Sequence, residues 1–289
     1  MVVGEAVPGD ASKPDDRRAG SRELSTLWRG IEVLQVLQQW TWKGEGWGNN
    51  RIAEYLDADK SQISRTLRVL TEAGLVVRDE VTRSYRLGPR MYSLGMRAAD
   101  QQLMRAAAAV ILRAAEAVDA RAFLVVRIGT EVCTIWSEQP ETMRPFVDSI
   151  GMVYPVIATD TGRALMYNTP DAEIRKLLQG GVHTSAQLEQ FISRVHEDRG
   201  RGFSSGLVQD GSSAVLALPV WGAGRSIVAT LGAEGPALLD QANIIPAVRV
   251  LSQTAAAITR RYTAVMDAHN GTASVPYQGW PDPPKFTRH

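Results

Sequence analysis

The sequence lacks the features that would place the protein in a membrane or outside the cell. Cys133 is the only cysteine, so no disulfide can form within the chain and nothing points to an oxidising compartment. No stretch approaches the run of about 20 apolar residues that a membrane helix needs. Residues 1–20 lack the apolar core of a signal peptide. We therefore expect a cytoplasmic protein with no membrane partner.

The sequence also has few histidines and almost no net charge, so neither a metal site nor a general affinity for nucleic acid is indicated. The four histidines show no spacing typical of a metal site, and the glycine-rich turns lack the lysine of a phosphate-binding loop. We expect no metal, no cofactor and no catalytic residue. The formal charge of +1 gives no general attraction to nucleic acid, so DNA binding would depend on a local basic surface.

Residues 60–74 carry the most informative pattern in the chain. Ile63, Leu67 and Leu70 form one apolar stripe along a helix, and Gly74 is well suited to end it. The opposite face carries cations and hydrogen-bonding groups: Lys60, Ser61, Gln62, Ser64, Arg65 and Arg68. Such a helix suits the major groove of DNA, and its N-terminal end favours phosphate. By itself the pattern is equally typical of an ordinary surface helix.

Two further helices are expected before this one. Apolar residues keep helical spacing between Leu24 and Trp40. A second short helix is predicted at residues 49–56, with Asn49 or Asn50 as its N-cap. Because only a tight turn separates the second helix from the third, the pair has the form of a helix-turn-helix.

A hairpin is predicted directly behind the third helix. Residues 75–78 and 84–87 are typical of two short strands joined by a polar turn. A hairpin in this place would be a wing, with Arg83 and Arg86 offered to phosphates. The alternative is that both arginines are merely solvated charges.

The segment at residues 40–48 contains three tryptophans and three glycines. Glycine breaks regular structure, whereas tryptophan is too apolar to stay in water. We expect a loop whose indoles cover the core beside the first helix. A contact with a partner or with the DNA minor groove is the alternative.

These residues resemble the winged helix of the isocitrate-lyase-regulator (IclR) family of bacterial transcription regulators. The resemblance runs from Lys60 to Leu75 and from Arg83 to Arg90, where Leu-Gly-Pro follows the wing. The insertion at residues 40–48 departs from the usual short turn. The resemblance implies an α+β chain of two domains: an N-terminal winged helix-turn-helix and a C-terminal GAF-like α/β effector-binding domain, joined by a helical linker.

The second half of the chain fits the same family. Strand patterns are expected at residues 121–128, 131–136, 214–221 and 226–232, and a long helix at 245–266. A loop that enters a helix, with Thr159 or Asp160 as N-cap, lies within residues 151–165. We therefore predict a disordered tail at 1–21, the winged helix at 22–90, a linker helix at 91–105, the effector-binding domain at 106–266 and a flexible tail at 267–289.

The resemblance implies a small-molecule effector held in the C-terminal domain. We expect its cavity to be lined by Phe123, Met152, Thr159, Phe203, Ser205 and Val215. This chain has Val215 where the family usually has cysteine, and Gly232-Ala233-Glu234 where it has Ser-x-Ser. The hydroxyl donors that would hold a carboxylate are thus missing, and Glu234 would repel an anion if it faced inward. A more apolar, neutral or cationic effector is expected, or none; the alternative is that these residues are plain core.

Two other functions remain open at this point. Residues 202–206 match G-x-S-x-G, which would make Ser204 the nucleophile of a hydrolase, but the motif needs a strand before it and a helix after it. The pattern here predicts the reverse order. A sensor that acts through a protein partner is the second alternative. We favour a DNA-binding transcriptional regulator that binds two related half-sites of double-stranded DNA as a homodimer or homotetramer.

Overall fold

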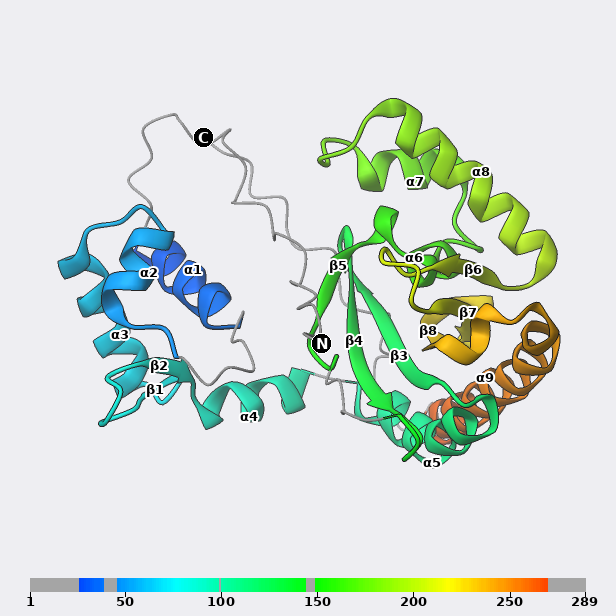
Figure 1. Cartoon of the computed structure of the whole chain (residues 1–289), viewed down its shortest axis with the longest axis horizontal. Coiled ribbons are helices and arrows are strands. Elements are labelled where there is room, and N and C mark those ends of the chain that lie inside the picture. Colours follow the sequence, from blue (N-terminus) through cyan, green and yellow to red (C-terminus); the bar gives the residue numbers. More distant parts are fainter. Residues whose placement is uncertain (1–25, 39–45, 99, 144–148, 270–289) are drawn as a thin grey trace, which may run out of the picture. The chain divides into compact units, whose positions relative to one another are not determined.

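The computed structural model describes residues 26–38, 46–98, 100–143 and 149–269, and within them the chain forms two compact units that divide between Ala98 and Asp100 (Figure 1). Each unit has its own apolar core. No helix in these ranges is long and apolar enough to cross a membrane. The predicted tail at residues 1–21 lies outside the described residues; the tail expected from residue 267 is helical to His269, and its remainder lies outside them.

The first unit is a three-helix module followed by a hairpin. Its elements are α1 (Thr26–Gln38), α2 (Asn49–Tyr55), α3 (Lys60–Glu72), β1 (Val76–Arg78) and β2 (Tyr85–Leu87). Apolar residues with helical spacing on α1, α2 and α3 pack with Val76 of β1 in one core, which includes Val33, Val36, Leu37, Ile52, Ile63 and Leu67. Gly74 ends α3 with a φ of +71°, a conformation that glycine adopts without strain. The predicted helix-turn-helix and wing are confirmed.

Trp47 adds a third strand position to the wing. Its backbone forms an isolated antiparallel bridge with Tyr85 of β2, while its indole is buried and meets the ring of Tyr55 edge-on at 5.4 Å. The guanidinium of Arg51 covers the same indole at 4.5 Å. For Trp47, the prediction of an indole that covers the core is confirmed; Trp40 and Trp42 lie outside the described residues.

The bridge also corrects the expected start of α2. Gly48 occupies the N-cap position, and no side chain caps the helix. Gly48 leaves the bridge with extended backbone, so both residues proposed as N-cap, Asn49 and Asn50, are already helical.

The predicted linker is two helices instead of one. α4 (Pro89–Ala98) follows the wing, and α5 (Gln101–Val118) begins the second unit. The side chain of Asp100 accepts hydrogen bonds from the amides of Gln102 and Leu103, both at 3.0 Å. Because aspartate is a strong N-cap, it begins a new helix here, before the break that apolar spacing predicted at residue 105.

The second unit is a six-stranded antiparallel sheet with helices on both faces (Figure 1). Its strands are β3 (Arg121–Ile128), β4 (Glu131–Glu138), β5 (Val153–Pro155), β6 (Ser204–Leu207), β7 (Ala214–Trp221) and β8 (Ile227–Gly235), in the order β5-β4-β3-β8-β7-β6. The helices are α6 (Asp160–Leu165), α7 (Asp171–Leu178), α8 (Ser185–Arg201) and α9 (Gln241–His269). The predicted two-domain α+β fold is confirmed.

Alternation along the strands separates two cores. Ala122 and Leu124 point toward α5 and α9, whereas Phe123 and Val125 point toward α6, α7 and α8. We call these the α5/α9 face and the α6–α8 face. Since residues directly opposite each other in neighbouring strands share a face, the register assigns every strand residue to one of them.

Caps explain most of the helix boundaries in this unit. Thr159 is the N-cap of α6, as predicted, and Thr184 forms a capping box at the start of α8. Pro170 occupies the N-cap position of α7, and no side chain caps this helix. α9 begins at Gln241 instead of residue 245 and keeps Pro246 inside the helix.

Candidate DNA interface and effector site

The outward face of α3 is polar and basic. All eight residues predicted to meet DNA are exposed: Lys60, Ser61, Gln62, Ser64, Arg65, Arg68, Arg83 and Arg86. In the part of the chain that the structure describes, none of the five cations among them is held in a salt bridge. The apolar stripe of α3 is buried, so the helix has only this face to offer.

Asp59 fixes the first turn of α3. Its Oδ1 atom accepts hydrogen bonds from the amides of Ser61 at 2.9 Å and Gln62 at 3.1 Å, and from the Ser61 hydroxyl at 2.5 Å. These bonds, the hydroxyl's first, hold the pKa of Asp59 below its ordinary value. The expected attraction of the helix N-terminus for phosphate is therefore partly met by Asp59 already, and the side chains of Lys60 and Arg65 must supply the rest.

Removing this cap is expected to loosen the helix. Asp59→Ala should lower the melting temperature of the first unit and weaken DNA binding, while Asp59→Asn, also a good N-cap, should keep most of both. Because folding lowers the pKa of Asp59, the part of its contribution that depends on the ionised carboxylate is present at neutral pH and is lost as the pH falls through that lowered pKa. Circular dichroism melting curves recorded at neutral and at strongly acidic pH check this. Equal melting of Asp59→Ala and wild type at pH 7 would contradict it.

The wing loop is shaped by a second aspartate. Asp79 Oδ1 accepts hydrogen bonds from the amides of Val81 at 2.9 Å and Thr82 at 2.7 Å, which lowers the pKa of Asp79. Arg83 follows with a φ of +56°. The loop thus has a defined turn, with exposed Arg83 on it and exposed Arg86 on β2.

Two of the six predicted effector-site residues lie together on the sheet. Phe123 and Val215 both belong to the core of the α6–α8 face. The Phe123 ring lies over Gly232, where an added Cβ atom would come within 2.5 Å of a ring carbon. A side chain here, where the resembled family usually has serine, would therefore require the Phe123 ring to move.

The six residues do not line one cavity, which corrects the prediction. Ser205 lies opposite Leu216, and both Phe203 and Leu216 pack in the core of the α5/α9 face, so Phe203 and Ser205 lie on the wrong side of the sheet. Met152 is exposed. Thr159 is half-buried, and its hydroxyl accepts the Gly162 amide hydrogen bond at 2.9 Å as the cap of α6.

Arg121 neutralises the acid that was expected to repel anions. Glu234 lies opposite both Arg121 and Val215 in the sheet, so it faces the α6–α8 side. Its Oε2 atom accepts a hydrogen bond from Arg121 at 2.6 Å, and the same guanidinium lies 4.9 Å from the centre of the Phe123 ring. Arg121 could not be predicted from the sequence, because its partner Glu234 lies 113 residues away and the pair gives no local pattern.

Two serines on or beside the sheet were also missed. Ser137 lies opposite Phe123, on the α6–α8 face, and Ser149 precedes β5. Both hydroxyls are buried and have no hydrogen-bond partner within the described residues. A buried hydroxyl without a partner costs free energy, so each is a candidate contact for a bound polar group.

The residues considered for catalysis have structural surroundings. Ser204 is fully buried and begins β6, which follows α8 in the sequence. Its hydroxyl forms a hydrogen bond of 2.9 Å with the hydroxyl of Tyr167. The order of elements is a helix followed by a strand, the reverse of a nucleophile elbow. Cys133 is half-buried, and burial raises the pKa of its thiol, which disfavours the reactive thiolate.

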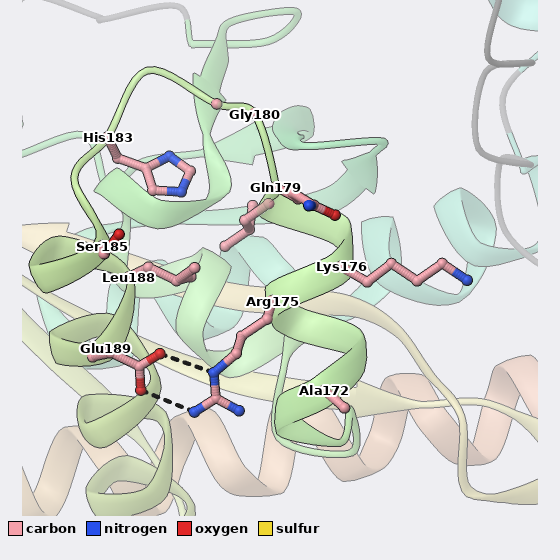
Figure 2. A pocket seen from close by; sticks show the side chains of 11 residues that line it. Ala172, Arg175, Lys176, Gln179, Gly180, His183, Ser185, Leu188 and Glu189 are labelled. Carbon is pink, nitrogen blue, oxygen red and sulfur yellow. Dashed lines mark hydrogen bonds and ion pairs between the residues drawn. The ribbon is translucent and has the colours of Figure 1, made fainter.

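A shallow hollow of about 540 Å³ lies between α7 and α8 (Figure 2). Figure 2 shows Arg175 and Glu189 joined along one side, with N–O distances of 2.8 and 2.9 Å, and His183 across from them. Both members of the ion pair are about half exposed. Among the described residues no group of histidine, cysteine and acidic side chains could hold a metal ion.

Comparisons with known proteins agree with this architecture. Residues 26–80 match the family model of the IclR helix-turn-helix domain. The IclR transcriptional regulator of Alicyclobacillus acidocaldarius has a similar structure, with a TM-score of 0.68 and 24% identity over 83% of this chain and 100% of that one. An IclR homologue of Microbacterium hydrocarbonoxydans, solved with 4-hydroxybenzoate, has a TM-score of 0.68 and 19% identity over 82% and 99%. The IclR protein of Thermotoga maritima also has a similar structure, with a TM-score of 0.60 and 19% identity over 82% of this chain and 98% of that one.

No curated protein was found to match the sequence. The family model covers the helix-turn-helix, and the solved structures share the architecture of both units. The first unit is therefore similar to the IclR helix-turn-helix domain over residues 26–80, and the chain has the two-domain fold of the solved IclR transcriptional regulators.

Proposed function

We propose that the protein is a DNA-binding transcriptional regulator whose affinity for its operator is changed by a small molecule bound to the second unit. One observation carries the proposal: the only polar, basic face of α3 is exposed in a module that matches the IclR helix-turn-helix model. A regulator of this kind acts where bacterial DNA lies, in the cytoplasm.

The side chains on α3 and the wing suit different parts of a duplex. Gln62 can bond adenine, and Arg65 or Arg68 can bond guanine, each through two hydrogen bonds in the major groove. Lys60, Ser61 and Ser64, in the N-terminal part of α3, would meet phosphates or base edges, and Arg83 and Arg86 would meet the flanking phosphate backbone. One such helix spans only a few base pairs, so we propose a homodimer, or a homotetramer built from dimers, on two related half-sites.

The effector is proposed to bind on the α6–α8 face. The homologue with 4-hydroxybenzoate supports a small aromatic ligand, and Phe123 and Val215 offer an apolar surface of that kind. The unpartnered hydroxyls of Ser137 and Ser149 can bond its polar atoms. The Arg121–Glu234 pair offers both charges. An anionic group of the ligand would replace Glu234 as the partner of Arg121, and a cationic group would replace Arg121 as the partner of Glu234. Because coupling between two binding sites is reciprocal, an effector that changes the affinity for DNA must bind the free protein and the DNA-bound protein with different affinities.

Selection of bound fragments from random DNA tests the proposal. We expect enrichment of one sequence with two related halves at about 150 mM salt, where non-specific contacts weaken. A sensor that acts only through a protein partner would enrich no sequence. Turnover of a reactive ester that Ser204→Ala abolishes would instead support a hydrolase, although the burial of Ser204 argues against this.

Arg65→Ala is expected to weaken operator binding by roughly 1–3 kcal/mol and to relax the preference at one base pair. The reason is that a base-reading arginine contributes both affinity and selectivity. Binding to a panel of single-base operator variants is the measurement. Arg83→Ala serves as the control, because loss of a phosphate contact should weaken all variants alike and reduce the salt dependence. A uniform loss for Arg65→Ala would reassign it to the phosphate backbone.

A further inference from the structure

Val69 is the exception on the outward face of α3. Val69 is apolar but 59% exposed, because it lies off the buried stripe of α3. Val69 follows Arg65 by four residues and Gln62 by seven, so the three share one side of the helix. An exposed valine in the middle of a polar, basic surface is explained if that surface meets an apolar group.

The major groove of DNA supplies one such group. Thymine presents its C5-methyl there, and apolar side chains recognise it by contact. The charge around Val69 favours this occupant over an apolar protein partner: the exposed cations Arg65 and Arg68 precede it by four residues and by one, and they outnumber the one acid of α3, Glu72, three residues after it. Valine in a helix also has essentially one χ1 rotamer, so little side-chain entropy is lost on contact.

We propose that Val69 contacts the methyl group of a thymine in the operator and so determines specificity at that base pair. This rests on the proposed function. Gln62 and Val69 lie two helical turns apart, about 10.5 Å along the axis. Because a helix in the major groove is inclined to the DNA axis, this distance covers at most about three base-pair steps. The contacted thymine should therefore lie no more than about three pairs from the adenine that Gln62 reads.

Replacement of thymine by deoxyuridine tests the contact, because it removes only the methyl group. Each thymine of the selected operator is replaced in turn, and the dissociation constants of the full-length wild type and of Val69→Ser are compared. Wild type should bind one uridine operator about threefold to tenfold more weakly than the thymine operator. Val69→Ser should bind the two equally.

Val81→Ser is the matched control, since Val81 on the wing loop is 92% exposed in the same unit. Val81→Ser should keep the preference of wild type for thymine, because Val81 lies on the wing loop and not on α3, the helix proposed to meet the methyl group in the major groove. If wild type tolerates uridine everywhere, or if Val69→Ser keeps the wild-type preference, the inference about Val69 is overturned while the proposed function stands. Failure to select any operator sequence overturns the proposed function and, with it, the inference.

Discussion

Replacing Arg163 with methionine is expected to lower the free energy of unfolding by about 3–5 kcal/mol at pH 7. The Arg163 guanidinium donates to Asp198 at 2.6 Å, to Asp160 at 2.5 Å and to the carbonyl of Ser205 at 2.8 Å, and so joins α6, α8 and β6. The side chains of Arg163 and Asp198 are only 8% and 3% exposed. Methionine fills similar space but leaves two carboxylates in a poorly hydrated site.

The exposed pair of Figure 2 is the matched control. Arg175→Met breaks a bidentate contact with Glu189 whose side chains are 45% and 57% exposed, and should lower the free energy of unfolding far less than Arg163→Met, because solvent screens the exposed charges. Urea denaturation of both variants gives the comparison. Equal losses would show that burial of the Arg163 cluster does not matter.

The pH dependence gives a second check on Arg163→Met. Burial raises the pKa of Asp160 even though Arg163 lies beside it, and loss of the cation should raise that pKa further. A carboxyl group with a raised folded-state pKa favours the folded state when it is protonated. The deficit of Arg163→Met relative to wild type should therefore narrow as the pH falls through the raised pKa of Asp160. A deficit that stays constant or widens would contradict this.

Gly162→Ala should have the second largest effect, a loss of about 2–3 kcal/mol. A Cβ atom at Gly162 would lie 2.1 Å from the carbonyl oxygen of Val156 and 2.8 Å from the hydroxyl of Thr159. Neither atom can move easily, because one is backbone and the other caps α6 through the Gly162 amide. The first turn of α6, which Thr159 caps, must therefore shift.

Gly200→Ala is the control for the helical glycine. Gly200 lies in α8, and a Cβ atom there would meet no heavy atom within 4 Å. Alanine should therefore stabilise the unit by about 0.5–1 kcal/mol through helix propensity. The same urea titration separates the two variants. Wild-type stability of Gly162→Ala would show that the contact with Val156 is not rigid.

The sequence predicted the elements whose pattern is strong. The spacing of Ile63, Leu67 and Leu70 fixes which side of α3 is buried, and therefore which side can meet DNA. Gly74 and the two short strand patterns after it predicted the wing, because all of these signals lie within one short stretch of sequence. These are the parts of the site for which neighbours in sequence are also neighbours in space.

Prediction failed where the pattern was weak or the partner distant. Residues 204–207 read Ser-Ser-Gly-Leu, with no clear alternation, and in a strand an error of one residue reverses the face. That is why Ser205 was placed in the effector site, whereas Ser204 points to the α6–α8 side. The pairs Arg121–Glu234 and Arg163–Asp198 join residues far apart in the chain, so only the sheet register and the packing of α6 on α8 bring them together.

The bridge between Trp47 and Tyr85 has a consequence for how the protein behaves at high concentration. A two-stranded hairpin leaves unpaired amides and carbonyls along its outer strand, and another chain can add a strand there. Here the amide and carbonyl of Tyr85 that point away from β1 are already bonded to Trp47, at 2.9 and 3.3 Å. Trp47 thus occupies this edge at Tyr85, which hinders the addition of a strand to the wing and the aggregation that follows from it, while Arg83 and Arg86 stay exposed.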